Sequence, residues 1–110
     1  MFEVLETPQY RNWLDGLRDN RARIRIGMRM ERLEQGNPGD HKDFGDISEL
    51  RVDYGPGYRV YYSRQCNEII ILLAGGDKRT QDKDIEAARK LAAELQEERN
   101  HGKDKGSSQI

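Results

Sequence analysis

Two arginines stand where a predicted β-hairpin brings them face to face. Polar and apolar residues alternate in the segment 49–62, ELRVDYGPGYRVYY, on both sides of a turn at 55–57, a pattern typical of two antiparallel strands joined by a hairpin turn. Because antiparallel partners have a constant sum of residue numbers, Arg51 faces Arg59, and Tyr61 lies on the same side of the sheet. Facing guanidinium groups repel each other, so a phosphate held between them would stabilise the pair.

The same strands also allow an interpretation that needs no ligand. Carboxylates stand close to the arginines in sequence, at Glu49 and Asp53. Each arginine can form an ion pair with one of these carboxylates, or with another one, on a solvated face of the sheet. The sequence alone leaves both interpretations open.

A second basic group follows the most apolar segment of the chain. The run 69–74, IIILLA, predicts a central strand that is buried on both faces. Lys78 and Arg79 come after it, before a helix that Thr80 is expected to cap. Free N–H groups at a helix start, next to two cations, favour phosphate binding. Alternatively, nearby carboxylates already occupy these groups: Asp77, Asp82 and Asp84.

A third basic group lies along a helix predicted at 21–35. Its members recur every three or four residues and form a ridge about 16 Å long, which matches several phosphate spacings: Arg21, Arg25, Arg29 and Arg32. The alternative is a solvated face whose arginines pair with carboxylates elsewhere. Ile24 and Met28 lie opposite the main apolar sector of this helix, so they either pack under a neighbouring element or form a docking surface for another chain.

Composition limits the remaining chemistry. The formal net charge is −1 and the isoelectric point is near 6.1, so any basic surface must be local. The single cysteine, Cys66, excludes an internal disulfide, and no spacing of Cys, His or carboxylate residues predicts a metal or cofactor site. His41 lies in a polar segment, 40–46, that is expected to be a loop. Its side chain is either a proton carrier or simply solvated. We expect neither a signal peptide nor a membrane span, and therefore a cytoplasmic protein.

These basic groups need a scaffold to position them. The expected elements are a short strand at 2–6, a helix that starts at Thr7-Pro8, the helix at 21–35, three strands, and a final helix with an apolar stripe over 85–95. This order predicts an α+β fold, a small antiparallel sheet with an N-terminal helix hairpin and a C-terminal helix. A chain of 110 residues has room for one domain, expected over 1–98, and the polar segment 99–110 is expected to be disordered.

The runs ELRVDYGPGYRVYY and IIILLAGGDKRTQDKDIEAARK resemble the signature of the RelE/ParE toxin superfamily, specifically its HigB-like branch of putative addiction module killer proteins. The resemblance extends from Phe2 to about Leu95 and implies the RelE-like fold, whose concave sheet face holds mRNA in the ribosomal decoding site. It implies a metal-independent, ribosome-dependent endoribonuclease in which a ribose 2′-OH attacks the adjacent phosphate, without a cofactor. It also implies a small helix-turn-helix antitoxin as partner, with Ile24 and Met28 as candidate interface residues.

The resemblance assigns roles to residues of this sequence. Arg59 would stabilise the transition state, and Tyr61 would orient the nucleotide or stack on a base. Further phosphate contacts are expected from Arg51, Lys78 and Arg79, and ribosomal RNA contacts from Arg21, Arg25, Arg29 and Arg32. Several RelE toxins carry a tyrosine or histidine near the start of the last helix, and the segment 81–85 has neither. Asp84 is then the candidate base, and Lys83 is a second candidate as well as an RNA contact.

Two other functions remain open at this point. The ParE half of the superfamily poisons DNA gyrase, and its members tend to lack basic residues on the sheet face, so the basic residues here favour RNA cleavage. The other alternative is a non-catalytic homologue that binds its antitoxin and regulates its own operon. The missing tyrosine or histidine keeps that alternative open.

Overall fold

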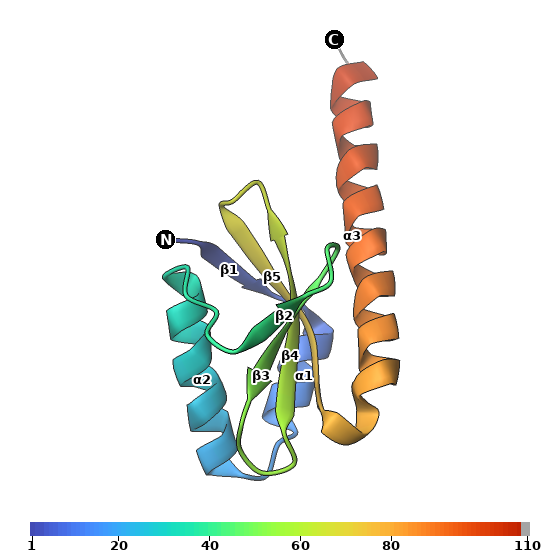
Figure 1. Ribbon diagram of the computed structural model, residues 1–110. Coiled ribbons are helices and arrows are strands. Elements are labelled where there is room, and N and C mark those ends of the chain that lie inside the picture. Colours follow the sequence, from blue (N-terminus) through green and yellow to red (C-terminus); the bar gives the residue numbers. More distant parts are fainter. Residues whose placement is uncertain (109–110) are drawn as a thin grey trace.

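The computed structural model describes the backbone of residues 1–108 and the side chains of residues 1–98, and it confirms the α+β class (Figure 1). The elements follow one another in the order β1 (Glu3–Glu6), α1 (Pro8–Asp15), α2 (Asn20–Glu34), β2 (His41–Asp43), β3 (Ser48–Val52), β4 (Tyr58–Gln65), β5 (Ile69–Asp77), a 3-10 turn η1 (Lys78–Thr80) and α3 (Gln81–Ser108). This arrangement is compatible with a RelE-like fold.

Over the described residues the strands form one sheet in the order β1-β5-β4-β3-β2. The predicted hairpin is confirmed, with Arg51 paired with Arg59 and Leu50 paired with Val60. The sheet is mixed and not wholly antiparallel as predicted, since β1 runs parallel to β5. The chain leaves β1 through the helices and returns beside it only with β5, a long connection of the kind that parallel neighbours require. The segment expected to be a loop contains β2, which pairs with β3 at the sheet edge.

Side-chain caps fix the start of the first two helices. The Thr7 hydroxyl accepts a hydrogen bond of 3.1 Å from the Tyr10 amide and donates one of 2.7 Å to the Leu73 carbonyl. It therefore caps α1, as predicted, and also attaches this helix to β5. Asp19 caps α2 by accepting bonds from the amides of Arg21 and Ala22.

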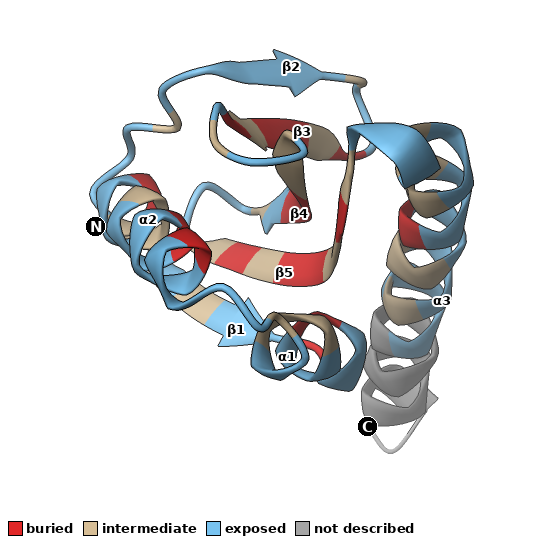
Figure 2. Cartoon of the chain, turned by 90° about the horizontal axis from the view of Figure 1, so that it is seen from below, coloured by how far each residue is buried: buried red, intermediate tan, exposed pale blue. Residues whose placement is uncertain are grey.

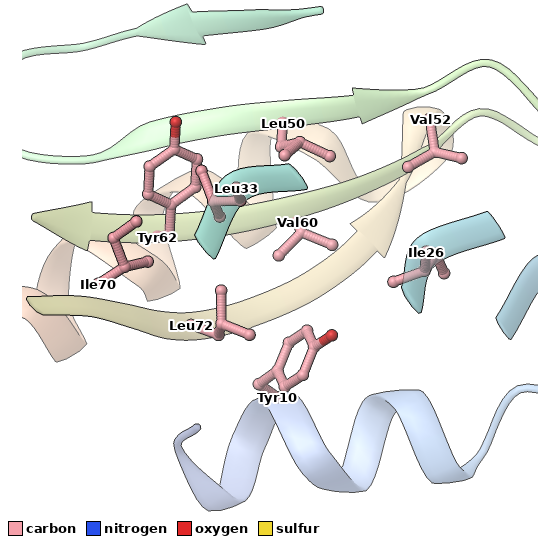
Figure 3. Packing of buried hydrophobic residues seen from close by; sticks show 9 residues of the cluster. All are labelled: Tyr10, Ile26, Leu33, Leu50, Val52, Val60, Tyr62, Ile70 and Leu72. Carbon is pink, nitrogen blue, oxygen red and sulfur yellow. The ribbon is translucent and has the colours of Figure 1, made fainter. Parts of the chain in front are cut away.

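The sheet buries apolar side chains on both faces. On one face, α1 and α2 pack against the sheet through a cluster that Figure 3 shows: Tyr10, Ile26, Leu33, Leu50, Val52, Val60, Tyr62, Ile70 and Leu72. On the other face α3 covers a second cluster: Ile47, Tyr61, Leu73 and Ala88. Figure 2 shows α2 and α3 on opposite sides of the sheet. The prediction that β5 is covered on both faces is confirmed.

Strand β5 extends beyond the predicted run 69–74, through Gly75 and Gly76 to Asp77. A Cβ atom on Gly75 would collide with the Trp13 indole, and one on Gly76 would collide with the Asp84 carboxylate. The glycines therefore allow α1 and α3 to lie directly against the backbone of β5. Their role here is close packing on a strand and not the flexibility of a loop.

The start and the end of α3 differ from expectation. Thr80 does not cap the helix. Asp77 caps η1 by accepting a hydrogen bond of 2.8 Å from the Arg79 amide, and α3 begins at Gln81. The segment 99–110, expected to be disordered, lies outside the residues whose side chains are described, and the backbone of α3 continues to Ser108.

Candidate active site

A buried carboxylate lies between the two facing arginines. The Glu49 side chain has no exposed surface, and its Oε1 lies 3.1 Å from Nε of Arg51 and 3.9 Å from Nη1 of Arg59. Its Oε2 accepts a hydrogen bond of 2.9 Å from Nε2 of Gln81, the first residue of α3. Glu49 therefore offsets the repulsion between the guanidinium groups and fixes the start of α3 beside them.

In the unliganded protein, this geometry favours ion pairs with carboxylates over a phosphate as the partner of the two facing arginines. The ion-pair interpretation is confirmed for Glu49, which serves both arginines, whereas Asp53 is exposed and forms no ion pair with a described residue. Sequence reasoning named Glu49 only as one of several carboxylates and did not foresee Gln81. The available signal was the strand period of two, which puts Glu49 on the face of Arg51.

Arg59 keeps hydrogen-bonding capacity that the described residues do not use. Its side chain is 13% exposed, and its Nε is buried without a hydrogen-bond partner among the described residues. The 3.9 Å contact with Glu49 is longer than a hydrogen bond. Buried donors are normally satisfied, so the unused donor of Arg59 suits an acceptor that is absent from the protein itself, such as a phosphate oxygen.

Tyr61 lies on the arginine face, as predicted, but it is fully buried under α3. The prediction that Tyr61 stacks on a base is wrong, because no face of its ring is free. Burial, and after it the neighbouring Glu49 carboxylate, raise the pKa of Tyr61. Its hydroxyl finds no hydrogen bond of ordinary geometry among the described residues. The strand pattern shows which side chains share a face and not which part of that face a helix covers.

Asp84 lies at the same end of the sheet as Arg59. Its carboxylate stands against Gly76, and Gly76 is the residue of β5 that pairs with Arg59. The Thr80 hydroxyl donates a hydrogen bond to Oδ2 of Asp84. The structure thus brings this predicted base close to the arginine pair and gives it a fixed orientation.

The basic residues around η1 divide into paired and free cations. Lys78, Arg79 and Lys83 line a shallow pocket of about 350 Å³. Arg79 forms an ion pair of 3.0 Å with Asp77. For this residue, the alternative that a nearby carboxylate already occupies the cation is confirmed. Lys78 and Lys83 are exposed and form no ion pair with a described residue.

The arginine ridge of α2 does not share a surface with Arg51 and Arg59. It belongs to the helix on the opposite side of the sheet from α3 (Figure 2). Arg29 is not a free cation either, because it donates hydrogen bonds to the Arg51, Pro38 and Asp40 carbonyls and so ties α2 to β3 and to the loop between them. The other members of the ridge, Arg21, Arg25 and Arg32, are exposed.

Ile24 and Met28 of the same helix are 63% and 53% exposed. The prediction that Ile24 and Met28 lie opposite the main apolar sector of α2 is therefore confirmed. The alternative that they pack under a neighbouring element is wrong.

His41 is exposed in β2, with Nδ1 2.8 Å from the Gly39 carbonyl oxygen, and it lies on the edge strand, away from β4. Among the described residues, no three His, Cys, Asp or Glu side chains are grouped so that they could hold a metal ion. No helix in the described part of the chain is both long enough and apolar enough to cross a membrane.

A small mixed sheet with helices on both faces is compatible with a RelE-like fold. Residues 12–97 match the family described as "Phage derived protein Gp49-like (DUF891)". The chain therefore belongs to the Gp49-like family, a RelE-like toxin family. It is also similar to an uncharacterized protein of Haemophilus influenzae (strain ATCC 51907 / DSM 11121 / KW20 / Rd), with 49% identity over 94 residues, which is 84% of this chain and 95% of the relative.

Proposed function

We propose that this protein is the toxin of a type II toxin-antitoxin module, of the HigB-like branch, and that it cleaves mRNA as a ribosome-dependent endoribonuclease. The observation that carries the proposal is the facing pair of Arg51 and Arg59, with an unused buried donor on Arg59. Membership of a RelE-like family supports the toxin class. The exposed cations Lys78 and Lys83, near the start of α3, support an RNA substrate.

The reaction is a transfer within the RNA. The ribose 2′-oxygen forms a bond to the adjacent phosphorus, the bond from phosphorus to the 5′-oxygen breaks, and a cyclic phosphate remains. A base takes the proton of the 2′-OH and an acid gives a proton to the departing oxygen. Negative charge gathers on the phosphorane oxygens, where a preorganised guanidinium is most effective. Arg59 performs this role, and Arg51 neutralises the neighbouring phosphate.

Asp84 is the proposed base. It lies next to the β5 residue that pairs with Arg59, and the Thr80 hydroxyl orients its carboxylate. Arginine cannot act as the base because it stays protonated. Glu49 is a poor candidate because its carboxylate has no exposed surface and already faces Arg51 and Arg59. Glu49 instead positions both arginines and supplies, in the free protein, the negative charge that a phosphate would supply in the complex.

The proposal extends to the partners and the place of action. The substrate is mRNA on the ribosome, so the protein acts in the cytoplasm. A small helix-turn-helix antitoxin is the proposed neutralising partner, supported by the resemblance of residues 2–95 to HigB-like toxins and by the family match.

A second candidate function rests on a specific observation. Arg51 and Arg79 are already paired with carboxylates of this chain, Glu49 and Asp77, and the segment 81–85 offers no tyrosine or histidine. A protein with these features can keep the fold and its partner and lack catalysis. Such a non-catalytic homologue would act through its antitoxin alone.

The test is to map new 5′ ends on a defined mRNA in a purified translation reaction, with and without ribosomes. Three chains are compared: the unmodified protein, Arg59→Ala, and Arg64→Ala as a matched control, since Arg64 is an exposed arginine of the same strand that stacks on Phe2 4.9 Å away. We expect new ends only with ribosomes, from the unmodified protein and Arg64→Ala. Translation that proceeds without new ends would contradict the proposal and direct attention to a gyrase cleavage assay.

A further inference from the structure

A groove runs between the outer side of α2 and the end of β3. Its volume is about 690 Å³, and its lining comes mainly from α2, with the last residue of β3 and Asp53 on the far side. The groove belongs to the face of the sheet that carries Leu50 and Val52, whereas Arg51 and Arg59 belong to the face under α3. It is therefore a second surface, separate from the candidate active site.

The groove contains an apolar strip that the fold leaves uncovered. Ile24 and Met28 line it and are 63% and 53% exposed. They are one helical turn apart, so their side chains form one continuous strip along α2. Such a strip is unfavourable in water, because apolar side chains of this size are stabilised when another apolar surface covers them. The strip is suited to contact with another apolar surface.

Arginine side chains border the strip. Arg21, Arg25 and Arg32 line the groove, and none of them forms an ion pair with a described residue. Arg25 is held in place by the ring of Tyr54, with its guanidinium carbon 4.6 Å from the ring centre. One carboxylate, Asp53, lies on the β3 side of the groove. The rim therefore favours a ligand with negative charge.

We propose that this groove binds an acidic amphipathic helix of a partner protein. The apolar side of that helix packs on Ile24 and Met28, and its carboxylates pair with Arg21, Arg25 and Arg32. A helix in a groove recognises such a combination through apolar anchors one turn apart and charges on either side. An RNA strand would neutralise the arginines but leave the apolar strip in water, so the observations favour protein over RNA. The inference rests in part on the proposed antitoxin partner, because Ile24 and Met28 are its candidate interface residues, and it does not depend on RNA cleavage.

The test uses a synthetic peptide of about 20 residues, long enough for about five helical turns, with leucines at helical spacing and glutamates beside them. Binding is measured by fluorescence anisotropy, and the contact surface is located from amide chemical-shift changes in the full-length protein. Two control peptides have the same leucines with lysines for glutamates, or the same composition in scrambled order. A short RNA hairpin is the competing probe.

The variants separate the apolar contribution from the charged one. Ile24→Ser with Met28→Ser should weaken binding of the acidic peptide by about tenfold or more, whereas Leu5→Ser, at an exposed leucine of β1, should leave it unchanged. Arg21→Glu with Arg25→Glu should reverse the preference, so that the lysine peptide binds better than the acidic one. Arg18→Glu is the matched charge control, because Arg18 is exposed and lies before α2.

Four outcomes would overturn the proposal. They are equal binding of the acidic and scrambled peptides, shift changes outside the groove, tighter binding of the RNA hairpin to the same residues, and self-association of the chain that Ile24→Ser abolishes. The last two would assign the groove to RNA or to a second copy. The mRNA cleavage assay is read separately, so loss of cleavage and loss of peptide binding remain distinguishable.

Discussion

Arg51 and Arg59 occupy directly opposite positions on β3 and β4, and both approach the same oxygen atom of Glu49, at 3.1 and 3.9 Å. Facing arginines would destabilise an isolated hairpin, so the pair persists because a buried carboxylate neutralises it. A negative charge is thus part of the folded site even without a substrate. The first prediction follows from the charge balance of these three side chains.

Glu49→Gln should destabilise the fold and make it sensitive to anions. The amide keeps the volume and removes the charge, which leaves two guanidinium groups facing each other. We expect a loss of about 2 kcal/mol in the free energy of unfolding, below the value for a fully buried pair because Arg51 is 34% exposed. Added sulfate should restore part of this loss, since it can occupy the space between the arginines. Urea unfolding with and without sulfate measures both effects.

Glu6→Gln is the control for this substitution. Glu6 forms an exposed ion pair with Arg11, which should contribute less than about 1 kcal/mol. Sulfate should then affect the Glu6→Gln variant and the unmodified protein equally. The assignment of Glu49 as counter-charge of both arginines would be refuted by equal sulfate effects on all three chains.

Tyr61→Phe should be tolerated, in contrast to what a catalytic tyrosine predicts. The hydroxyl is buried without a hydrogen bond of ordinary geometry, and removing an unsatisfied buried polar group is neutral or stabilising by about 1 kcal/mol. We expect unchanged or higher stability and unchanged mRNA cleavage. Tyr54→Phe is the matched control, since the Tyr54 hydroxyl donates a hydrogen bond of 3.1 Å to Asp19. A specific loss of cleavage in Tyr61→Phe would return Tyr61 to the active site.

The sequence predicts the elements that local patterns determine. The alternation in 49–62 yields the register that pairs Arg51 with Arg59, because each side chain's face follows from a period of two. Thr7 before Pro8 locates the first helix correctly, since its hydroxyl caps α1. The apolar run of β5 predicts burial on both faces, which the two clusters confirm. These features need no knowledge of distant contacts.

The sequence does not predict features that depend on distant segments. The burial of Tyr61 depends on where α3 lies, and the close packing on Gly75 depends on Trp13, which is far away in sequence. The cap at Asp77 replaced the predicted cap at Thr80 because a 3-10 turn precedes α3. The ridge of α2 was expected to contact ribosomal RNA, and its place on the opposite side of the sheet from α3 could not be predicted, because the face that a helix covers is not encoded in its own period.

Alanine at Gly75 or Gly76 should destabilise the protein through close packing. The added methyl group would collide with the Trp13 indole or with the Asp84 carboxylate, at a cost of about 1–3 kcal/mol. Gly27→Ala is the matched control, because Gly27 lies within α2 with no atom near the added methyl group, and it should stabilise by about 0.4–1 kcal/mol. Thermal unfolding of the three variants measures the contrast. Gly76→Ala should also reduce cleavage, since it displaces Asp84.

Arg29→Met should destabilise the protein far more than Arg32→Met. Arg29 donates hydrogen bonds to three backbone carbonyls of the sheet and the loop before it, whereas Arg32 is exposed on the same helix. Loss of these bonds should cost about 1–3 kcal/mol because the carbonyls are left without this donor, and the unbranched methionine keeps the apolar packing of the stem. Urea unfolding measures the difference. Equal stability of the two variants would show that Arg29 does not hold the loop.

Asp77 should make the stability of the start of α3 depend on pH at the acidic end. The Arg79 side chain, which hydrogen-bonds to Asp77, holds the pKa of that carboxyl below its ordinary value of 3.8. A carboxyl with a lowered pKa stabilises the folded state above the unfolded-state pKa and loses this contribution as the pH falls through the folded-state value.

Asp77→Asn keeps an oxygen that can cap η1 and removes only the charge. It should therefore be less stable than the unmodified protein near neutral pH and equally stable in strong acid. Asp82→Asn, in the first turn of α3 without an ion pair among the described residues, is the matched control, and urea unfolding at several pH values measures both variants. A constant difference between Asp77→Asn and the unmodified protein at every pH would assign the role of Asp77 to the cap geometry and not to its charge.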